Sequence, residues 1–460
     1  MPSVADAVVC VDFGSTFTKA ALVDLAQGRI VASASHATTI PVPDSGGDVL
    51  DGYDACVVSL SEQDPRAADA EVLACSSAGG GLRIAVVGNE ELVTAEAGRR
   101  VALSSGGKVV QVLAMSGRVP GTDPWGVLRH TTRPDVVLLT GGTDGGNAEP
   151  IRDAARALVD CGWDGPVVVA GNLDAREDVA TILGHNPHVI ADNVVPRIGV
   201  LEPASARAAI REMFLAHVIG GKHLSSRVDF TEMVRGATPD VVLTAVELLA
   251  RGLDEEHPGA GDVVVVDVGG ATTDVHSVVT LDPEDTGLSR EVVATTPVTR
   301  TVEGDLGMRW SAPTTVTEVG RTDLAAAAER RHADPGYLPD TDEEIEIDEA
   351  IATAAVGVAL RRHAGRSRVV VSPEGRVVER SGQDLREVDL LVCSGGVFRN
   401  GKPGLARRAL SGSTGEHVDG GWQLPRRPRV LVDHDYVLAA AGLLAERHPE
   451  AAYRLVTGLT

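Results

Sequence analysis

Aromatic residues, lysines and cysteines are all scarce in this chain, and each shortage limits what the protein can be. Aromatics make up 3% of the 460 residues, so a core must be built mainly from Val, Leu, Ile and Ala. The five cysteines are odd in number, scattered and without a C-x-x-C pair. This distribution argues against disulfides, structural zinc and iron–sulfur ligation within one chain. We therefore expect a protein of the reducing cytoplasm.

Positive charge and long apolar runs are also in short supply. The chain carries 65 acidic against 42 basic residues, a formal net charge of −23, and only four of the basic residues are Lys. Such a surface repels phosphate backbones and anionic lipids, and no basic patch offsets it. No apolar run approaches the roughly 18 residues of a membrane helix, and the first residues lack the basic segment of a secretory signal. We expect neither nucleic acid nor membrane as a partner.

The length and the alternation of apolar runs predict several domains of α/β type. At roughly 150 residues per domain, the chain has room for about three. After residue 54, short apolar runs alternate with Ala-rich helical segments, a pattern typical of βαβ units around a parallel sheet. The first two runs, Ala55–Leu60 and Val72–Ala74, are interpreted as strands of that sheet. The predicted divisions are residues 1–53 as the start of a first lobe, 54–200 as an inserted α/β domain, and 201–460 as the remainder of the main body.

A first glycine-containing turn lies in residues 8–25, VVCVDFGSTFTKAALVDL. A buried strand ends at Asp12, the residues Gly14, Ser15 and Thr16 form a tight turn, and Lys19 follows on the returning strand. Glycine lets a backbone approach phosphate, and N–H groups and hydroxyls then donate to its oxygens. Asp12 can hold Mg²⁺ through water, because Mg²⁺ keeps several waters. Lys19 can either reach phosphate or pair with a carboxylate of the lobe.

A second turn, in residues 262–278, repeats this plan with the sequence DVVVVDVGGATTDVHSV. Its strand ends in an acidic residue, two glycines follow, and hydroxyls and a second carboxylate open the returning strand. These positions are Asp267, Gly269, Gly270, Thr272, Thr273 and Asp274. Either hairpin alone is compatible with an ordinary tight turn. Two copies 255 positions apart predict instead that one polyphosphate is held between two lobes.

A third turn lies in residues 390–400, LLVCSGGVFRN, where Gly395 and Gly396 follow a strand. Two small residues at a strand end suit close packing against a flat base or sugar. An ordinary strand-to-helix turn is the alternative for this motif taken by itself.

The order of these three motifs resembles the superfamily of actin, sugar kinases and the ATPase domain of heat-shock chaperones. The resemblance implies a two-lobed actin-like ATPase with duplicated, ribonuclease H-like lobes that close over Mg-ATP. It implies Asp12 and Asp267 near the metal, Gly14–Thr16 and Gly269–Thr273 on the phosphates, and Gly395 with Gly396 at the adenosine. Asp274 falls where the chaperones carry a catalytic-site Asp.

The same resemblance suggests further site residues. In the superfamily a helix before the second hairpin presents a polar group to the attacking water, and residues 237–252 make Thr238 and Asp240 candidates. Glu202, followed by proline as in the chaperones, is a rival further upstream. A Gly-Asp-Leu-Gly turn beginning at Gly304 is similar to one that opens a helix near the phosphates in the chaperone and cell-division relatives.

The whole chain resembles the glutamate mutase accessory family, often called MutL and unrelated to the mismatch-repair protein of that name. The resemblance rests on strings spread from residue 11 to residue 400: VDFGSTFTKA, SSAGGGLRIAVVG, LLTGGTDGGN, VVVAGN, FLAHVIGGKHL, VVVDVGGATTDVHSV, EGDLGMR and LVCSGGVFRN. It implies an ATP-dependent, chaperone-like partner of the subunits of an adenosylcobalamin-dependent mutase, one that uses ATP and Mg²⁺ to release damaged cofactor. The D-x-H-x-x-G motif of cobalamin domains is absent, which favours a helper over a cofactor carrier.

Other functions on a related core stay open. A small-molecule kinase would need a carboxylate base facing a substrate hydroxyl, and no clear upstream motif supplies one. A polymerising actin-like scaffold predicts filaments with ATP, and an activator of radical dehydratases would need cysteines for an iron–sulfur cluster. Within the predicted insert, the loop LLTGGTDGGN at 138–147 is either an anion cradle or a turn that requires positive φ angles.

Overall fold

The computed structural model describes residues 6–39, 47–116, 123–281, 296–372, 375–416 and 420–460. The chain divides into two compact units. The first comprises Met1–Ala78, Glu232–Arg290 and Pro297–Thr460, and the second comprises Gly79–Thr231 with Glu291–Thr296. In the described part of the chain, no helix is both long and apolar enough to cross a membrane.

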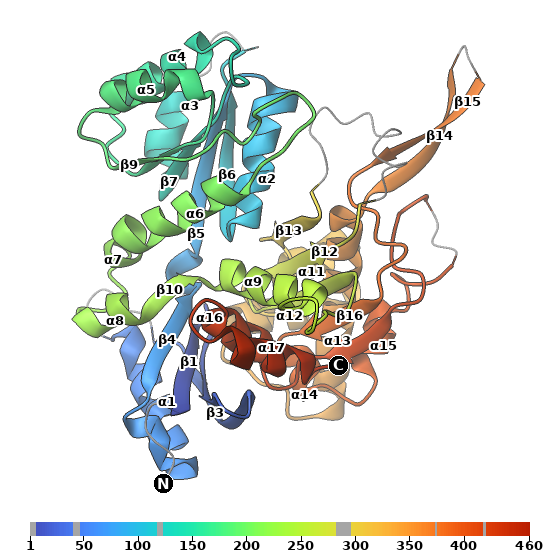
Figure 1. The fold of residues 1–460 in the computed structure, drawn as a ribbon. Coiled ribbons are helices and arrows are strands. Elements are labelled where there is room, and N and C mark those ends of the chain that lie inside the picture. The colour runs from blue at the N-terminus through green and yellow to red at the C-terminus, as the bar shows by residue number, and fades with distance from the viewer. Residues whose placement is uncertain (1–5, 40–46, 117–122, 282–295, 373–374, 417–419) are drawn as a thin grey trace. The chain divides into compact units, whose positions relative to one another are not determined.

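The first unit contains two five-stranded sheets with the same plan (Figure 1). In each, three antiparallel strands are followed along the chain by two strands that add in parallel at the other edge. One sheet has the order β10-β4-β1-β2-β3, with β1 (Ala7–Phe13), β2 (Phe17–Asp24), β3 (Arg29–Ala37), β4 (Glu71–Ser76) and β10 (Val234–Ala237). The other has the order β13-β12-β11-β16-β17, with β11 (Val263–Val268), β12 (Thr273–Val278), β13 (Val298–Glu303), β16 (Leu390–Ser394) and β17 (Arg429–Val432). This repetition confirms the predicted two-lobed, actin-like α/β fold.

Two helices lie between the sheets of the first unit and join their cores. Helix α9 (Thr238–Arg251) packs on β11 and β12, whereas α16 (Val437–Leu444) packs on β1 and β4 and crosses α9. One buried cluster accordingly mixes residues of both sheets, such as Val8 and Val265, with residues of both helices, such as Val242 and Ala441. A Cβ on Gly442 would lie 2.0 Å from the carbonyl oxygen of Val241. The absent side chain therefore lets the two helices touch at their backbones.

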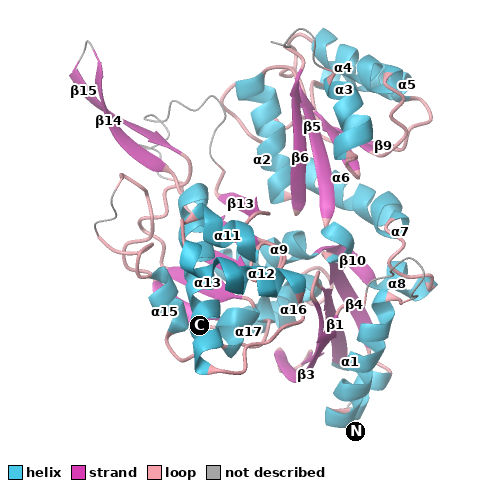
Figure 2. Ribbon diagram, turned by 180° about the vertical axis from the view of Figure 1, so that it is seen from behind, coloured by secondary structure: helices cyan, strands magenta, loops and turns pink. Residues whose placement is uncertain are grey.

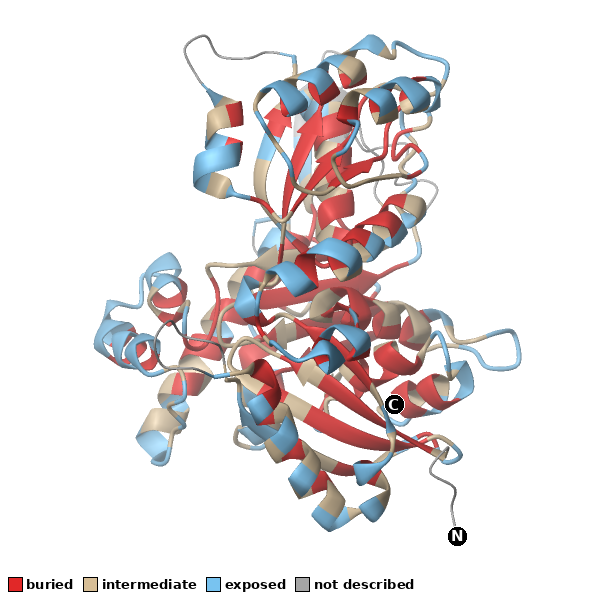
Figure 3. Cartoon of the chain, turned by 90° about the vertical axis from the view of Figure 1, so that its left-hand side faces the viewer, coloured by how far each residue is buried: buried red, intermediate tan, exposed pale blue. Residues whose placement is uncertain are grey.

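Outer helices cover the remaining faces of the two sheets. Helix α1 (Val49–Gln63) packs on β2 and β3, and α13 (Asp342–His363) packs on β11, β12 and β13. The remaining elements of this unit are α11 (Ala312–Glu318), α12 (Ala325–Ala333), β14 (Arg366–Ser372), β15 (Gly375–Ser381), α14 (Gly396–Asn400), α15 (Leu405–Leu410) and α17 (Pro449–Thr457). Figure 3 shows that buried positions concentrate on the strands and on the inward sides of the helices. Val, Leu and Ala dominate these positions, as the scarcity of aromatics predicts.

The second unit is built on one parallel sheet with helices on both faces (Figure 2). Its strands β5 (Leu82–Gly88), β6 (Gly107–Ala114), β7 (Val136–Leu139), β8 (Val167–Val169) and β9 (His188–Ile190) take the order β6-β5-β7-β8-β9. Helices α2 (Glu96–Ser104) and α6 (Ala204–Met213) contact each other over one face. Helices α4 (Glu149–Asp160) and α5 (Arg176–Leu183) pair over the other. Short helices α3 (Pro124–Gly126), α7 (Ile219–Gly221) and α8 (Val228–Met233) complete its described α-helices.

The border of the second unit differs from the predicted insert of 54–200. Ala55–Leu60 is part of helix α1, which begins at a capping box formed by Asp48 and Asp51. Val72–Ala74 is a strand, β4, but pairs with β1 in the first unit. A short apolar run does not distinguish a strand from a buried helix, and it does not specify its partner strand. The second unit consequently spans Gly79–Thr231.

Candidate functional site

The tips of the two predicted hairpins meet in the first unit. A Cβ built on Gly270 would lie 2.6 Å from Thr16 Oγ1, so a side chain at that position would have to displace the Thr16 hydroxyl. Thr16 belongs to the turn between β1 and β2, and Gly270 to the turn between β11 and β12. Residues more than 250 positions apart are thus in direct contact.

The first turn is tight and offers a buried hydroxyl. The Gly14 N–H donates to the Phe17 carbonyl at 3.2 Å, and a Cβ on Gly14 would lie 2.6 Å from that oxygen. The Thr38 hydroxyl donates to the Gly14 carbonyl at 2.8 Å. Thr16 Oγ1 is buried and has no hydrogen-bond partner among the described residues, while Ser15 beside it is partly exposed. A buried hydroxyl without a partner is costly and is a feature expected where a ligand binds.

Asp12 lies at the centre of the contacts made by the first hairpin. The Thr238 hydroxyl, at the start of α9, donates to Asp12 Oδ1 at 2.7 Å. The Lys19 ammonium lies 3.5 Å from Asp12 Oδ2 and 4.0 Å from the centre of the Tyr436 ring. Burial lowers the pKa of Lys19, but Asp12, Tyr436 and Asp267 raise it above its ordinary value. Lys19 is therefore charged and already paired with a carboxylate of its own lobe.

The second turn is held from behind by the segment that contains Gly304. The Met308 N–H donates to the Gly269 carbonyl at 3.0 Å and the Arg309 N–H to the Gly270 carbonyl at 2.8 Å. The Ser311 hydroxyl donates to the carbonyls of Ala271 and Gly304. The predicted helix does not open at the Gly304 turn, because α11 begins only at Ala312. The intervening backbone is used instead to brace the hairpin.

Arg362 fixes the two acidic side chains that flank Gly304. Its guanidinium pairs with Glu303 at 2.7 Å and with Asp305 at 2.8 Å. It also reaches Glu318 at 3.0 Å. These carboxylates are therefore committed to one arginine.

Asp267 and Asp274 face each other across the antiparallel strands β11 and β12. Burial, opposed by Lys19 and reinforced by Asp274, Asp12 and Asp433, raises the pKa of Asp267 to about 6. Asp274 pairs with the buried guanidinium of Arg300 at 2.9 Å and accepts from the Thr272 hydroxyl at 3.3 Å. Asp267 is thus the carboxylate whose charge is least compensated in this cluster.

Thr273 is separated from these carboxylates by the alternation of side chains along β12. It lies on the same side of the strand as Val275, which belongs to the core under α13. Its hydroxyl is fully buried and has no partner in the described part of the chain. The structure brings together Thr16, Gly270, Asp267 and Asp274, but it turns the Thr273 side chain to the other face.

The third turn joins the second hairpin at the end of β16. Gly395 has φ of 108°, and a Cβ there would lie 2.2 Å from the Val268 carbonyl oxygen. No other residue fits this position, for both reasons. A Cβ on Gly396 would be 3.7 Å from the Tyr436 hydroxyl, so the turn also borders the start of α16.

The remaining candidates, Asp240 and Glu202, occupy different units. Asp240 lies in the first turn of α9 and is 2% exposed. Glu202 is an exposed residue of the second unit, just before α6. Thr238, at the start of the same helix, contacts Asp12 directly through its hydroxyl.

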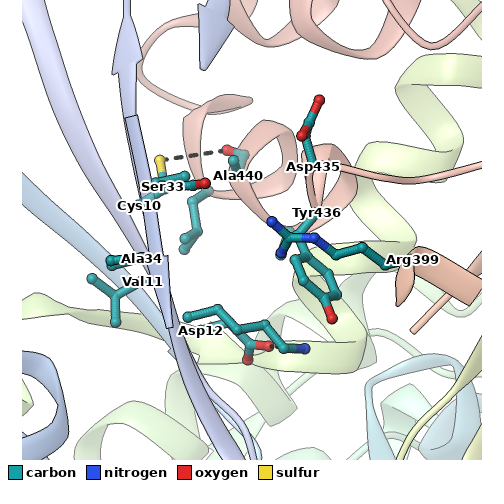
Figure 4. A pocket seen from close by; sticks show the side chains of 14 residues that line it. Cys10, Val11, Asp12, Ser33, Ala34, Arg399, Asp435, Tyr436 and Ala440 are labelled. Carbon is teal, nitrogen blue, oxygen red and sulfur yellow. Dashed lines mark hydrogen bonds and ion pairs between the residues drawn. The ribbon is translucent and has the colours of Figure 1, made fainter. Parts of the chain in front are cut away.

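Sequence reasoning missed three residues of this region. Tyr436, Arg399 and Asp435 line, together with Asp12, Lys19 and Ser33, a cavity of about 20 Å³ (Figure 4). The Arg399 guanidinium lies 4.8 Å from the centre of the Tyr436 ring. Tyr436 and Asp435 lie in the string DHDY, residues 433–436, and no local pattern in that string connects it with β2. Arg399 lies within the third motif, residues 390–400, so that motif could have indicated it as a site residue.

Comparison with known proteins identifies the family. The model of the MutL protein family matches residues 8–459. Protein MutL of Clostridium tetanomorphum is 34% identical over 467 aligned positions, which cover 98% of either chain. This chain belongs to the MutL protein family. The predicted membership of the glutamate mutase accessory family is therefore confirmed.

The solved structures that match this MutL-family chain are less similar to it in sequence than its MutL relative is. The ethanolamine utilization protein EutJ of Carboxydothermus hydrogenoformans is 11% identical with a TM-score of 0.30, covering 96% of this chain and 90% of its own. Xylulose kinase of Bifidobacterium adolescentis is 11% identical with a TM-score of 0.32, covering 99% and 94%. TM-scores at this level support no inference about mechanism.

The donor set at the hairpins fits a magnesium-bound nucleotide. Among the residues that the structure describes, no group of three or more His, Cys, Asp or Glu is arranged to hold a metal directly. Mg²⁺ commonly uses one or two carboxylates together with waters and substrate phosphates. The glycine turns, the unpartnered Thr16 hydroxyl and the Lys19 ammonium supply donors suited to phosphate.

The glycine-rich loop of the second unit is occupied with its own contacts. Gly141, Gly142 and Gly145 have φ of 151°, 71° and 71°. The Asn193 amide donates to the Gly142 carbonyl at 3.0 Å, and the Asn172 amide donates to the Gly146 carbonyl at 3.1 Å. The positive φ angles and the amide contacts favour a structural turn over an anion cradle.

Proposed function

We propose that this MutL-family chain is an ATPase that binds Mg-ATP between its two hairpins and serves an adenosylcobalamin-dependent mutase. The contact between Thr16 and Gly270 is the observation that carries the proposal, because one polyphosphate can accept from both turns only if they meet. Family membership supports the accessory role. The reducing cytoplasm is the compartment proposed for it.

Nucleotide binding is assigned to the three turns. The backbone N–H groups of both hairpins and the hydroxyls beside them would donate to phosphate oxygens, and Lys19 would add a charge-assisted bond. The proposed phosphate-binding residues are Gly14, Ser15, Thr16, Lys19, Gly269, Gly270, Thr272 and Thr273, with Gly304 bracing the second turn. Gly395 and Gly396 would border the nucleoside. For Thr273, only the backbone is positioned to take part.

Catalysis is assigned to the carboxylates and the polar start of α9. Asp12 and Asp267 would hold Mg²⁺ through water, and the metal would neutralise charge on the phosphates. Thr238 is the best placed of the proposed water-orienting residues, because its hydroxyl already contacts Asp12. Asp240 and Asp274 are the other two; the Asp274 carboxylate is held in place by its ion pair with Arg300.

The proposed action on a mutase requires the nucleotide site to be coupled to the helices between the sheets. Thr238 opens α9, and α9 touches α16 backbone to backbone at Gly442. A rearrangement of the hairpins around nucleotide would therefore shift a helix pair that both lobes share. We propose that this movement separates mutase subunits so that damaged cobalamin leaves.

Two measurements test the proposal. Purified protein should release phosphate from Mg-ATP, and Asp12→Ala or Asp267→Ala should abolish this release while the circular dichroism spectrum stays unchanged. Phosphate transfer to an added acceptor would point to a kinase instead. For the partner, the protein should co-purify with a candidate adenosylcobalamin mutase and restore activity, with ATP, to enzyme inactivated by hydroxocobalamin. Recovery without ATP would contradict the motor role.

A further inference from the structure

Tyr436 occupies an unusual backbone position at the start of α16. Its φ of 55° and ψ of 38° lie in the left-handed region, which side chains larger than Asn rarely adopt. Of the three described non-glycine residues with positive φ, Arg133, His223 and Tyr436, only Tyr436 belongs to the first unit. The conformation is unfavourable for a tyrosine, so the placement of its ring calls for a reason.

Two cations from different lobes contact the ring of Tyr436. Figure 4 shows one of them, Arg399, beside the ring. The Lys19 ammonium, on β2, is 4.0 Å from the ring centre, and the Arg399 guanidinium, on α14, is 4.8 Å from it. Each is a cation–π contact within the attractive range. Lys19 follows the first phosphate turn, and Arg399 follows the nucleoside turn at Gly395 and Gly396. One aromatic ring thus contacts a cation that follows the first phosphate turn and a cation that follows the nucleoside turn.

A phosphate group and the Tyr436 ring compete for the same ammonium. A phosphate oxygen makes a charge-assisted hydrogen bond that is stronger than a cation–π contact at a partly exposed site. The side chain of Lys19 is 28% exposed and contacts Asp12 as well as the ring. A polyphosphate at the Gly14–Thr16 turn would draw Lys19 away from the ring, and the ring would lose one of its two supports.

Movement of Tyr436 would displace the start of α16, which follows it directly in the chain. The Asp433 carboxylate accepts from the N–H groups of Val437 and Leu438, which form the first turn after Tyr436. The body of α16 packs on β1 and β4 of one lobe and on α9. The start of α16 directly follows Tyr436, and the helix belongs to the core shared by both lobes.

We infer that Tyr436 is a positioning residue that holds Lys19 and Arg399, yields Lys19 to phosphate, and so couples occupancy of the nucleotide site to α16. This inference rests on the proposed ATP site and specifies how that site is regulated. It makes Tyr436 a competitor of the nucleotide for Lys19, so removing the ring tightens binding. A residue that only packs would leave affinity unchanged.

The test uses the full-length protein and two ring-removing variants that suit a left-handed backbone. Tyr436→Asn and Tyr436→Gly both tolerate positive φ, so loss of folding does not confound the result. Tyr436→Phe keeps the ring face, and Tyr453→Phe is a control on α17, away from the cavity. The probes are Mg-ATP and Mg-ADP, with the dissociation constant measured by calorimetry and amide exchange measured at Val437 and Leu438.

The expected results separate this inference from the proposed function. The Asn and Gly variants should bind Mg-ATP about two- to fivefold more tightly than wild type, as expected for removal of one exposed cation–π competitor. In wild type and in the two Phe variants, ATP should change amide exchange at Val437 and Leu438; in the Asn and Gly variants it should not. Unchanged affinity, weaker affinity, or an undiminished exchange response in Asn and Gly would each overturn the inference. If wild type itself binds no nucleotide, the proposed function fails first.

Discussion

The Thr238 hydroxyl donates to the Asp12 carboxylate at 2.7 Å, although the two residues are 226 positions apart. This bond joins the first strand of one sheet to the start of the helix that packs on the other sheet. It makes the position of Asp12 depend on α9, and it fixes the Thr238 side chain against Asp12. Substitution of Thr238 can distinguish a role in catalysis from a role in nucleotide binding.

Replacing Thr238 should slow catalysis more than it weakens nucleotide binding. Thr238→Val keeps the shape but removes the donor, and we expect kcat to fall about 10- to 100-fold with KM changed by less than about threefold. Thr238→Ser keeps the hydroxyl and should retain most of the activity. Steady-state phosphate release over a range of ATP concentrations measures both constants. A rise in KM at constant kcat would assign Thr238 to binding alone.

Asp267 should make Mg-ATP binding depend on pH near 6. Its pKa is raised to about 6 by burial and by neighbouring carboxylates. A protonated carboxyl is a poor partner for Mg²⁺, so affinity should fall as the pH is lowered through 6. Asp267→Asn should bind weakly at every pH and lose this titration. Calorimetric titrations between pH 5 and pH 8 would decide, and a pH-independent wild type would contradict the assignment.

The same shift predicts the effect of Asp267 on stability. Because the folded pKa lies above the ordinary value of 3.8, the folded state binds the proton more tightly, and the free energy of unfolding falls as the pH rises from about 4 to 6. Above pH 6 the buried Asp267 carboxyl is ionised, and its destabilising effect on the folded state is fully present. Asp267→Asn should therefore be more stable than wild type at pH 7.5, by about 1–2 kcal/mol once solvent screening is allowed for. The difference should vanish below pH 4 in urea unfolding curves.

Gly395 should tolerate no side chain, for two separable reasons. Gly395→Ala places a Cβ 2.2 Å from the Val268 carbonyl and forces an unfavourable positive φ. Gly404 also has a positive φ, 82°, but its Cβ would meet only the flexible end of Arg408. Gly404→Ala should cost about 1–2 kcal/mol from backbone strain alone, and Gly395→Ala about 3 kcal/mol or more. Urea unfolding measures the free energy of unfolding of both variants. Equal losses would show that the backbone around Val268 moves to relieve the contact.

The sequence predicted features that depend on a local pattern, and it did not predict contacts between residues that are distant in the chain. An acidic residue, glycine and hydroxyls between two strands identify each hairpin, because a tight turn and its neighbours are encoded within a few residues. The assignment of Ala55–Leu60 as a strand was wrong because a six-residue apolar run has no decisive period. Val72–Ala74 and Tyr436 acquire their places from pairing with β1 and from contact with Lys19. Such long-range partners leave no trace in a local pattern.

The crossing of α9 and α16 should depend on the absence of a side chain at Gly442. Gly442→Ala puts a methyl group 2.0 Å from the Val241 carbonyl oxygen, which is backbone and cannot turn aside. We expect a loss of about 2–3 kcal/mol and weaker cooperation between the lobes. Gly357, within α13, is the matched control, because its Cβ would meet nothing closer than Ser413 Oγ at 3.6 Å. Gly357→Ala should stabilise by about 0.5–1 kcal/mol, since alanine is the better helix former. Thermal unfolding measures the stability of both variants. If Gly442→Ala were as stable as Gly357→Ala, α9 and α16 would not need their backbone contact. The coupling assigned to this crossing would then have to pass through another element.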